Sequence, residues 1–200
     1  MKITIVDYGI GNLHSIRKAL ERAGAETEII SDMNRLEFSQ CIVFPGVGAF
    51  GEAMEKLSPV RNILSDKFND GVPALGICLG MQILFENSEE SSLGGIGFIG
   101  GAVRKLDADR IPQMGWNNVA FERDDPIFRG VPENAQFYFA NSYGCYPTEE
   151  VSLGMTTYGK SSFSSVIRKR NVFGFQYHPE KSSVAGLRII SNFVEMARSF

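Results

Sequence analysis

The sequence predicts an α/β fold in which helices flank an open, mostly parallel central sheet, with additional antiparallel strands in the second half. Up to about residue 86, short apolar runs alternate with segments whose apolar residues recur at helical spacing, which is typical of a parallel sheet covered on both faces. From residue 96 onward, β-rich runs follow one another, separated by turns rich in Gly, Pro and Asp. With 200 residues and 44% hydrophobic content, residues 1–200 are expected to form one domain.

The first half is expected to begin with a strand over residues 2–6 and a helix over residues 13–23, separated by a turn containing Gly9 and Gly11. Dinucleotide-binding folds begin in the same order, but His14 stands at the third glycine position of their fingerprint, which disfavours a nucleotide site. The elements predicted next are strands near 26–30 and at 41–44, helices at 49–57 and 59–70, and a strand at 73–77.

The second half is expected to contain several strands and a closing helix with one apolar stripe. Arg168, Lys169 and Arg170 separate two of these strands, so they predict a hairpin turn rather than a phosphate-binding patch. The strands are predicted at 98–106, 117–121, 136–141, 152–157, 163–168 and 172–176, and the helix at 184–198.

The composition excludes several classes of protein. A net charge of −3 and a pI near 5.5 give no reason to expect a nucleic-acid partner. No run approaches the roughly 18 apolar residues that a membrane span requires. Cys41, Cys78 and Cys145 are odd in number and far apart, so they match neither a disulfide framework nor a zinc site. We therefore expect a cytoplasmic protein with no metal and no cofactor.

A candidate nucleophile lies in the stretch Gly76-Ile77-Cys78-Leu79-Gly80-Met81-Gln82, between the strand at 73–77 and an apolar, helix-like segment. Small residues near Cys78 suit a sharp strand-to-helix turn that raises a nucleophile above the edge of a sheet. Free N–H groups at the start of the helix would favour a thiolate. Taken alone, the stretch is equally compatible with Cys78 as a small residue of the core.

Two other strand ends carry matching signals. Pro45-Gly46-Val47-Gly48 ends the strand at 41–44, and its glycines could aim N–H donors into an oxyanion hole, although an ordinary turn has the same composition. His178 follows the strand at 172–176, and Glu180 lies two residues on, where a carboxylate can orient the imidazole ring. Because parallel strands end at one edge of a sheet, the three segments together predict a nucleophile, an oxyanion hole and a base at one site.

The chain resembles class I glutamine amidotransferases, and within them the glutaminase subunits that serve histidine biosynthesis. The resemblance spans nearly the whole chain. Two further segments match the family, and together with the three strand ends described above they appear in the same order as in the family. These are Asp7-Tyr8-Gly9-Ile10-Gly11-Asn12-Leu13 and Met114-Gly115-Trp116-Asn117.

The resemblance implies a glutaminase that hydrolyses glutamine to glutamate and ammonia with a catalytic triad of Cys78, His178 and Glu180. It also implies an oxyanion hole formed by backbone groups and a set of residues that hold glutamine. The oxyanion-hole residues would be Val47, Gly48 and Leu79, and the glutamine-binding residues Gly46, Gln82, Glu90, Asn141, Ser142 and Tyr143.

The resemblance further implies a heterodimer with a cyclase subunit of the (β/α)8 barrel type. That partner would use the ammonia to make imidazole glycerol phosphate and aminoimidazole carboxamide ribotide. Asn12, Trp116 and Tyr138 would lie near the interface, whereas without the resemblance a single Trp is more often a core residue. Gln113 and Asn141 depart from the pattern, because histidine is usual at both positions in the histidine-pathway subunits.

These departures leave open a related glutaminase that supplies ammonia for the amidination of surface sugars. A cysteine hydrolase of peptides or γ-glutamyl compounds is a more remote alternative, since the same nucleophile and histidine serve either reaction. Gln82, Glu90 and the pair Ser142-Tyr143 favour free glutamine as the substrate. A non-catalytic binding subunit would be expected to lack the nucleophile or the base, and both are present.

Overall fold

A mixed sheet of eleven strands runs through the computed structural model, which describes residues 1–9, 13–46 and 48–199. In one half of this sheet all neighbours pair in parallel, in the order β2, β1, β3, β4 and β13. The bounds of these strands are β1 Lys2–Val6, β2 Glu26–Ile30, β3 Ile42–Phe44, β4 Ala74–Ile77 and β13 Val172–Phe175. The parallel core predicted from the sequence is confirmed.

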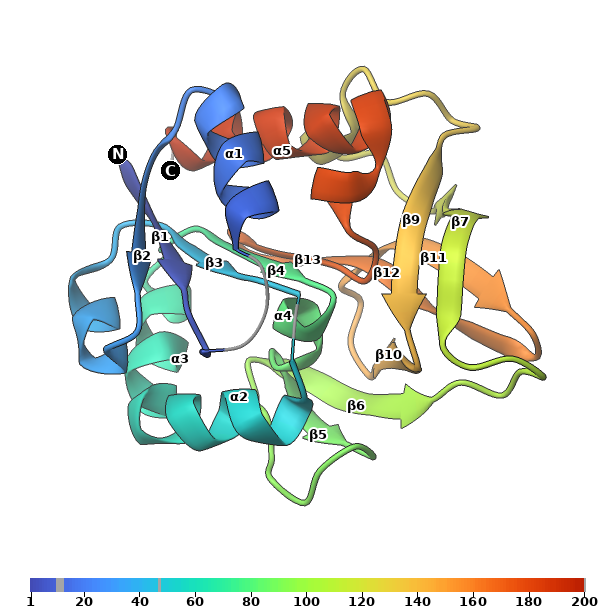
Figure 1. The fold of residues 1–200 in the computed structure, drawn as a ribbon, viewed down its shortest axis with the longest axis horizontal. Helices are drawn as coiled ribbons and strands as arrows, with labels where there is room; N and C mark the ends of the chain where they lie inside the picture. The colour runs from blue at the N-terminus through green and yellow to red at the C-terminus, as the bar shows by residue number, and fades with distance from the viewer. Residues whose placement is uncertain (10–12, 47, 200) are drawn as a thin grey trace.

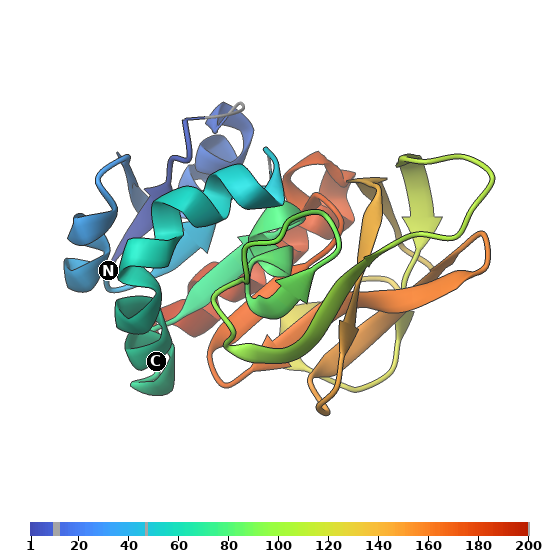
Figure 2. The ribbon, with the colours of Figure 1, turned by 90° about the horizontal axis from the view of Figure 1, so that it is seen from below.

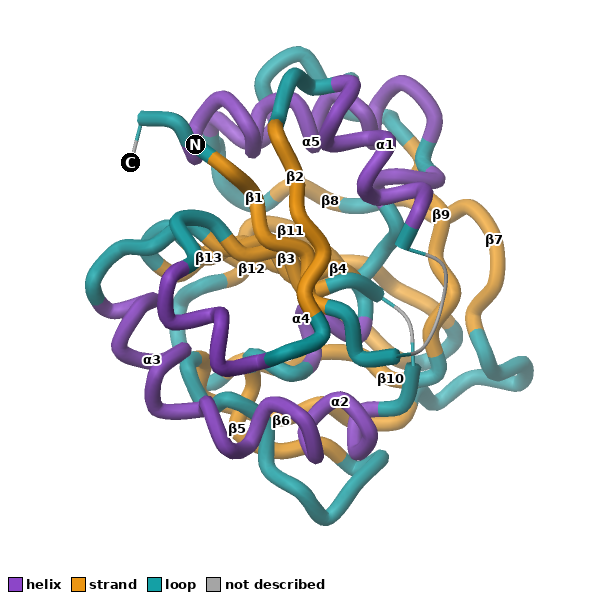
Figure 3. Tube along the Cα trace, turned by 60° about the vertical axis from the view of Figure 1, so that its left-hand side comes forward, coloured by secondary structure: helices purple, strands orange, loops and turns teal. Residues whose placement is uncertain are grey.

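Helices cover both faces of the parallel half, with α1 and α5 on one side and α2 and α3 on the other (Figures 1 and 3). Side chains along β1 alternate between the two faces of the sheet, so each face needs a covering layer. Ile3 and Ile5 belong to the apolar core beneath α1 and α5, whereas Val6 belongs to the core beneath α2 and α3. The helix bounds are α1 His14–Arg22, α2 Phe50–Leu57, α3 Arg61–Asn69 and α5 Ser183–Ala197.

The other half of the sheet is largely antiparallel. It begins where β12 pairs with β13 and continues through β10 and β6 to the edge strand β5, while β11 and β8 branch from β12. A separate antiparallel pair, β7 and β9, stands beside it (Figure 2). The bounds are β5 Phe85–Ser88, β6 Ile99–Lys105, β7 Gln113–Asn118, β8 Ala120–Phe121, β9 Gln136–Asn141, β10 Tyr143–Pro147, β11 Ser152–Tyr158 and β12 Ser161–Lys169.

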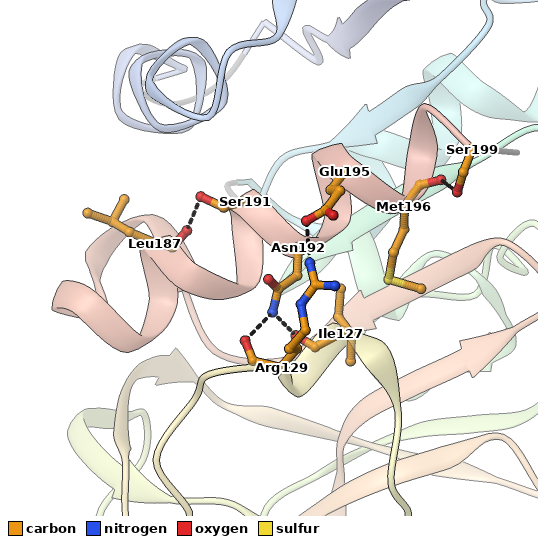
Figure 4. A network of polar contacts seen from close by, with 8 residues as sticks. All are labelled: Ile127, Arg129, Leu187, Ser191, Asn192, Glu195, Met196 and Ser199. Atoms are coloured by element: carbon orange, nitrogen blue, oxygen red, sulfur yellow. Dashed lines mark hydrogen bonds and ion pairs between the residues drawn. The ribbon is translucent and has the colours of Figure 1, made fainter.

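The closing helix α5 is bound to the segment beneath it by polar contacts (Figure 4). The Asn192 side chain donates to the backbone carbonyls of Ile127 and Arg129, each at 2.8 Å, and Arg129 also forms an ion pair with Glu195. Ile127 belongs to one of four short 3₁₀ helices in the described chain. They are η1 Met33–Phe38, η2 Ser58–Val60, η3 Pro126–Phe128 and η4 Pro179–Lys181.

Some sequence predictions were wrong in detail. The helix expected after Cys78 is a single turn, α4 (Leu79–Gln82), because the apolar run that follows enters the strand β5 beside β6. The strand expected at 117–121 is divided between β7 and β8, and β5 and β10 were not predicted. A short buried apolar run has no period that separates helix from strand, so strand pairing decided these cases. The hairpin at Arg168–Arg170 is confirmed, with Arg170 at a φ of 55°.

No helix in the described part of the chain is long and apolar enough to span a membrane.

The turn between β4 and α4 is packed backbone against backbone. A Cβ at Gly76 would lie 2.3 Å from the Gly80 carbonyl oxygen, and a Cβ at Gly80 would lie 2.0 Å from the Phe44 carbonyl oxygen. Real Cβ atoms do not approach other atoms so closely, so only glycine lets β3, β4 and α4 meet here. This packing fixes the position of Cys78.

We therefore expect Gly80→Ala to destabilise the protein by about 3 kcal/mol or more, because the Phe44 backbone cannot move aside without breaking its pairing with β4. Urea unfolding followed by circular dichroism measures the change. Gly51→Ala is the matched control: Gly51 lies in α2, and its added Cβ meets only the Ser91 side chain, 3.1 Å away. Its free energy of unfolding should stay within about 1 kcal/mol of wild type, and equal losses in both variants would contradict the prediction.

Candidate active site

The three segments singled out in the sequence meet at one edge of the sheet. β3, β4 and β13 are parallel neighbours, and Phe44 pairs with Gly76 while Phe175 pairs with Ile77. Each strand therefore ends at the same level, and the chain continues into Pro45, Cys78 and the segment leading to His178. The three strand ends therefore meet at the carboxyl edge of the sheet, as predicted.

Cys78 occupies a strained backbone conformation. Its φ of 47° and ψ of −104° lie outside the regions that non-glycine residues normally adopt, at a cost on the order of 1–3 kcal/mol. The conformation is held from both sides, because the Cys78 N–H donates to the Phe175 carbonyl at 2.7 Å and the Cys78 carbonyl accepts from Met81 and Gln82. The side chain is thereby directed into a cavity at the sheet edge, which it helps to line.

His178 lies against Cys78, and Glu180 lies against the other side of the His178 ring. Glu180 belongs to η4, and its Oε1 lies 2.8 Å from His178 Nδ1, which leaves Nε2 for the Cys78 sulfur. The backbone of this segment is bound to β9: the His178 N–H donates to the Tyr138 carbonyl at 2.8 Å, and the Tyr138 N–H donates to Ser182 Oγ at 2.9 Å. The ring therefore has a defined orientation in which one nitrogen faces the carboxylate and the other faces the thiol.

The electrostatics of this group favour a protonated imidazole. Burial alone disfavours the charged ring, but hydrogen bonds to the Cys78 sulfur and the Glu180 carboxylate outweigh it, together with the negative charges of both groups. The result is that the pKa of His178 rises from 6.5 to about 10. At neutral pH the arrangement holds an imidazolium between two acidic groups.

The turn after β3 lies against Cys78. A Cβ added at Gly46 would lie 2.9 Å from both Cys78 Cβ and His178 Cε1, so this turn touches both residues. Gly48 has a φ of 110°, which glycine adopts without strain. Gly48 and Leu79 both line the cavity beside Cys78, whereas Val47 lies outside the described residues.

A cavity of about 370 Å³ connects most of the predicted site residues. Ala140 and Lys181 also line it and were not predicted, while Asn141 is not among the lining residues. A larger cavity of about 600 Å³ along residues 119–133 contains none of the predicted residues. The predicted residues that line the smaller cavity are Gly46, Gly48, Cys78, Leu79, Gln82, Glu90, Ser142, Tyr143 and His178.

One wall of the cavity is built from oxygen atoms and amides. Burial raises the pKa of Glu90 against an opposing hydrogen bond from the Phe50 backbone, and the nearby Glu52 carboxylate adds to the rise. The Tyr143 carbonyl accepts from Gln82 Nε2 at 3.4 Å and from Asn141 Nδ2 at 2.9 Å. Asn141 therefore supports the wall from behind.

Gln176 has no predicted role, although its side chain is fully buried beside Cys78. Its Nε2 lies 3.5 Å from Cys78 Sγ, and its Oε1 accepts from Gln82 Nε2 at 3.1 Å. A signal was present in the sequence, since Gln176 is the single strongly polar residue in the apolar run Val172-Phe173-Gly174-Phe175-Gln176-Tyr177.

Trp116 and Tyr138 lie side by side on the outer face of the β7–β9 pair. Their ring centroids are 6.2 Å apart, and Trp116 is 51% exposed, so Trp116 is not a core residue. Met114, on the same face of β7, is 68% exposed. Asn12 lies outside the described residues.

The two positions that departed from the expected pattern form a buried pair. Gln113 and Asn141 stand opposite each other across β7 and β9, on the inner face of this sheet. Neither residue belongs to the exposed patch of Met114 and Trp116 on the outer face. Among the described residues, no group of three or more His, Cys, Asp and Glu side chains is arranged to hold a metal ion.

The family model described as glutamine amidotransferase class-I matches residues 4–197. The chain belongs to this family, and the family is one of enzymes. The fold agrees: a putative GMP synthase protein from Thermoplasma acidophilum superposes with a TM-score of 0.77 at 23% identity, covering 100% of this chain and 94% of that one. PurLQS from Thermotoga maritima superposes with a TM-score of 0.78 at 18% identity, covering 98% of both chains.

Within the family, the chain is similar to proteins named imidazole glycerol phosphate synthase subunit HisH. It is 49% identical to the protein of that name from Methanocaldococcus jannaschii, with 97% of this chain and 99% of the relative covered. It is 44% identical to the protein of that name from Moorella thermoacetica, with 98% of this chain and 95% of that relative covered. The likeness therefore extends over essentially the full length of both relatives.

The raised pKa of His178 predicts that its ring stays protonated through neutral pH, with a midpoint near 10 in an NMR titration of the imidazole protons. Because the pKa in the folded chain is above the unfolded value, the stability contributed by this proton is complete below pH 6.5 and is lost as pH rises through 10. Cys78→Ala removes one hydrogen bond and one charge and should lower the midpoint by roughly one unit or more.

The chain has two histidines, so His14→Gln assigns the His178 signal in that titration. Urea unfolding at pH 7 and at pH 10 tests the same linkage by an independent route. A His178 midpoint near 6.5 in the wild-type protein would show that Cys78 and Glu180 do not hold the proton on the ring.

Proposed function

We propose that this chain is the glutaminase subunit of an imidazole glycerol phosphate synthase. It hydrolyses glutamine to glutamate and ammonia and delivers the ammonia to a cyclase partner in histidine biosynthesis. One observation carries the proposal: Cys78 stands on a strained elbow beside the His178–Glu180 pair and opens into a cavity of about 370 Å³, which is large enough for one amino acid.

The first half of the proposed reaction transfers the γ-glutamyl group to sulfur. The Cys78 thiolate attacks the carboxamide carbon of glutamine, and the electron pair of the C=O bond moves to oxygen. Backbone N–H groups of Leu79 and of the Val47–Gly48 turn stabilise the oxyanion. When the C–N bond breaks, His178 donates its Nε2 proton to the departing nitrogen, so ammonia and a thioester are formed.

The second half releases glutamate. His178 is now neutral and takes a proton from water as the water oxygen attacks the thioester carbon. The tetrahedral intermediate collapses by breaking the C–S bond, which returns the thiolate and the protonated imidazole. Glu180 keeps Nδ1 occupied throughout, so Nε2 is the nitrogen that exchanges protons.

The cavity wall opposite Cys78 suits the polar head of glutamine. Glu90 and the Gln82 side-chain oxygen are acceptors for the α-ammonium group, and Ser142 and Tyr143 lie on the same wall. Gly46 leaves room for the carboxamide between Cys78 and His178, because any side chain there would fill that space. Asn141 acts indirectly by holding the Tyr143 carbonyl.

The ammonia must reach a second active site without entering the solvent. We propose a heterodimer with a cyclase of the (β/α)8 barrel type, docked on the face that carries Trp116, Met114 and Tyr138, and we propose that Asn12 contacts the same partner. The exposed aromatic and thioether side chains are those that protein interfaces favour. The three described cysteines are unpaired, which fits work in the cytoplasm.

The histidine pathway is favoured over the amidination of surface sugars because relatives named for it match over nearly the whole chain at 40–49% identity. A cysteine hydrolase of peptides is disfavoured by the cavity, because Glu90 and Gln82 offer acceptors to a free α-ammonium group, which a residue within a peptide lacks.

Glutamate release from glutamine tests the chemistry. The purified chain, mixed with the imidazole glycerol phosphate synthase cyclase from the same organism, should release glutamate faster when the cyclase carries its phosphoribulosyl substrate. Cys78→Ala should lower the stimulated rate by roughly 10³-fold or more, because the thioester cannot form. Full activity of the variant would overturn the proposed nucleophile, and absence of stimulation by an active cyclase would overturn the proposed pathway.

The docking face is tested by Trp116→Ala. Removing a half-exposed indole from an interface should weaken cyclase binding by about 2 kcal/mol, or roughly thirtyfold in Kd, measured by isothermal titration calorimetry. Phe38→Ala is the matched control, since Phe38 is an aromatic residue 80% exposed on η1, which packs against α3. This placement of the interface would be contradicted if both substitutions changed the Kd equally, or if neither changed it.

A further inference from the structure

Gln176 connects the glutamine cavity to the sulfur of Cys78. It follows β13 directly, its side chain is fully buried, and its backbone N–H donates to the Ser165 carbonyl at 2.9 Å. Its side-chain amide makes three contacts: Nε2 with Cys78 Sγ at 3.5 Å, and Oε1 with Gln82 Nε2 at 3.1 Å and with Cys145 Sγ at 3.6 Å.

One backbone carbonyl determines which atoms of the Gln82 and Gln176 amides donate and which accept hydrogen bonds. The Tyr143 carbonyl oxygen can only accept, so Gln82 must present its nitrogen to it. The same nitrogen contacts Gln176, which must therefore present its oxygen. Nε2 of Gln176 is left to face Cys78, and the sulfur receives an N–H donor.

Cys145 supports the same orientation. Burial raises the pKa of the Cys145 thiol well above its usual value, and the proximity of Cys78 adds to the rise, so Cys145 stays protonated. A protonated thiol donates to an oxygen, here Gln176 Oε1. The two sulfur atoms that contact Gln176 thus play opposite parts, with Cys145 as donor and Cys78 as acceptor.

A hydrogen bond donated to sulfur favours the thiolate, because the negative sulfur accepts far more strongly than the neutral one. The contact approaches Cys78 from the buried side, whereas the oxyanion turn lies at the cavity. The N–H of Gln176 therefore acts on the nucleophile itself.

We propose that Gln176 increases the reactivity of Cys78: its Nε2–H stabilises the thiolate, and Gln82 holds the amide in the donating orientation. This rests on the proposed role of Cys78 as the nucleophile. Gln82 lines the cavity, so the residue that meets the substrate also orients the group that activates the sulfur.

The test is the pH dependence of alkylation of Cys78 by iodoacetamide, located by mass spectrometry. Gln176→Met keeps the length of the side chain but removes the donor. It should raise the midpoint of the alkylation profile by about one pH unit and slow alkylation roughly tenfold below both midpoints. Alkylation needs no glutamine, so a failure of the proposed glutaminase function would not alter this readout.

Cys41→Ala is the matched control, because Cys41 is likewise a buried free cysteine, and no hydrogen bond joins its side chain to Gln176 or Cys78 in the described part of the chain. Its profile should coincide with wild type. An unchanged midpoint in folded Gln176→Met overturns the proposal. If circular dichroism shows that Gln176→Met does not fold, Gln82→Met decides: it removes the orienting donor, so a smaller upward shift supports the proposal and an unchanged midpoint overturns it.

Discussion

The close approach of three backbone segments at Gly76, Gly80 and Phe44 is the constraint on which the site depends. A Cβ at either glycine would collide with a carbonyl oxygen at 2.0–2.3 Å, so the chain can turn above β4 only where both side chains are absent. The turn places Cys78 at a φ of 47°, a conformation that is unfavourable by itself. It persists because the Cys78 backbone is bonded both to β13 and to the first turn of α4, and the sheet on either side is buried on both faces.

The antiparallel half contributes as much to the site as the parallel half that carries Cys78. Tyr138 on β9 uses both backbone groups to hold the segment from His178 to Ser182, and its ring lies on the outer face beside Trp116. One strand therefore joins the exposed aromatic patch to the backbone of His178. The Ala140 carbonyl, two residues further along β9, lies 3.8 Å from Cys78 Sγ, so the same strand also borders Cys78.

The sequence was sufficient to predict the parallel core, the elbow at Cys78 and the meeting of three strand ends, because each depends on local pattern and on the geometry of parallel sheets. It could not predict that Asn141 supports the cavity wall from behind or that Gln176 contacts the sulfur. Both depend on which way an amide points, and that is decided by partners such as the Tyr143 carbonyl, distant in sequence from Gln82. The short α4 and the strand β5 were missed for a related reason, since only pairing with β6 distinguishes them from a longer helix.

The electrostatics of the resting site fit the two roles that the proposed mechanism gives His178. A pKa of about 10 makes the imidazolium a stable proton carrier beside the Cys78 sulfur, but it would make the ring reluctant to act as a base. The Cys78 sulfur causes much of that rise, through both a hydrogen bond and its charge. Once the sulfur is acylated, both contributions vanish while the opposing effect of burial remains. The pKa of His178 must then fall, so thioester formation itself converts the ring from the acid that releases ammonia into the base that activates water.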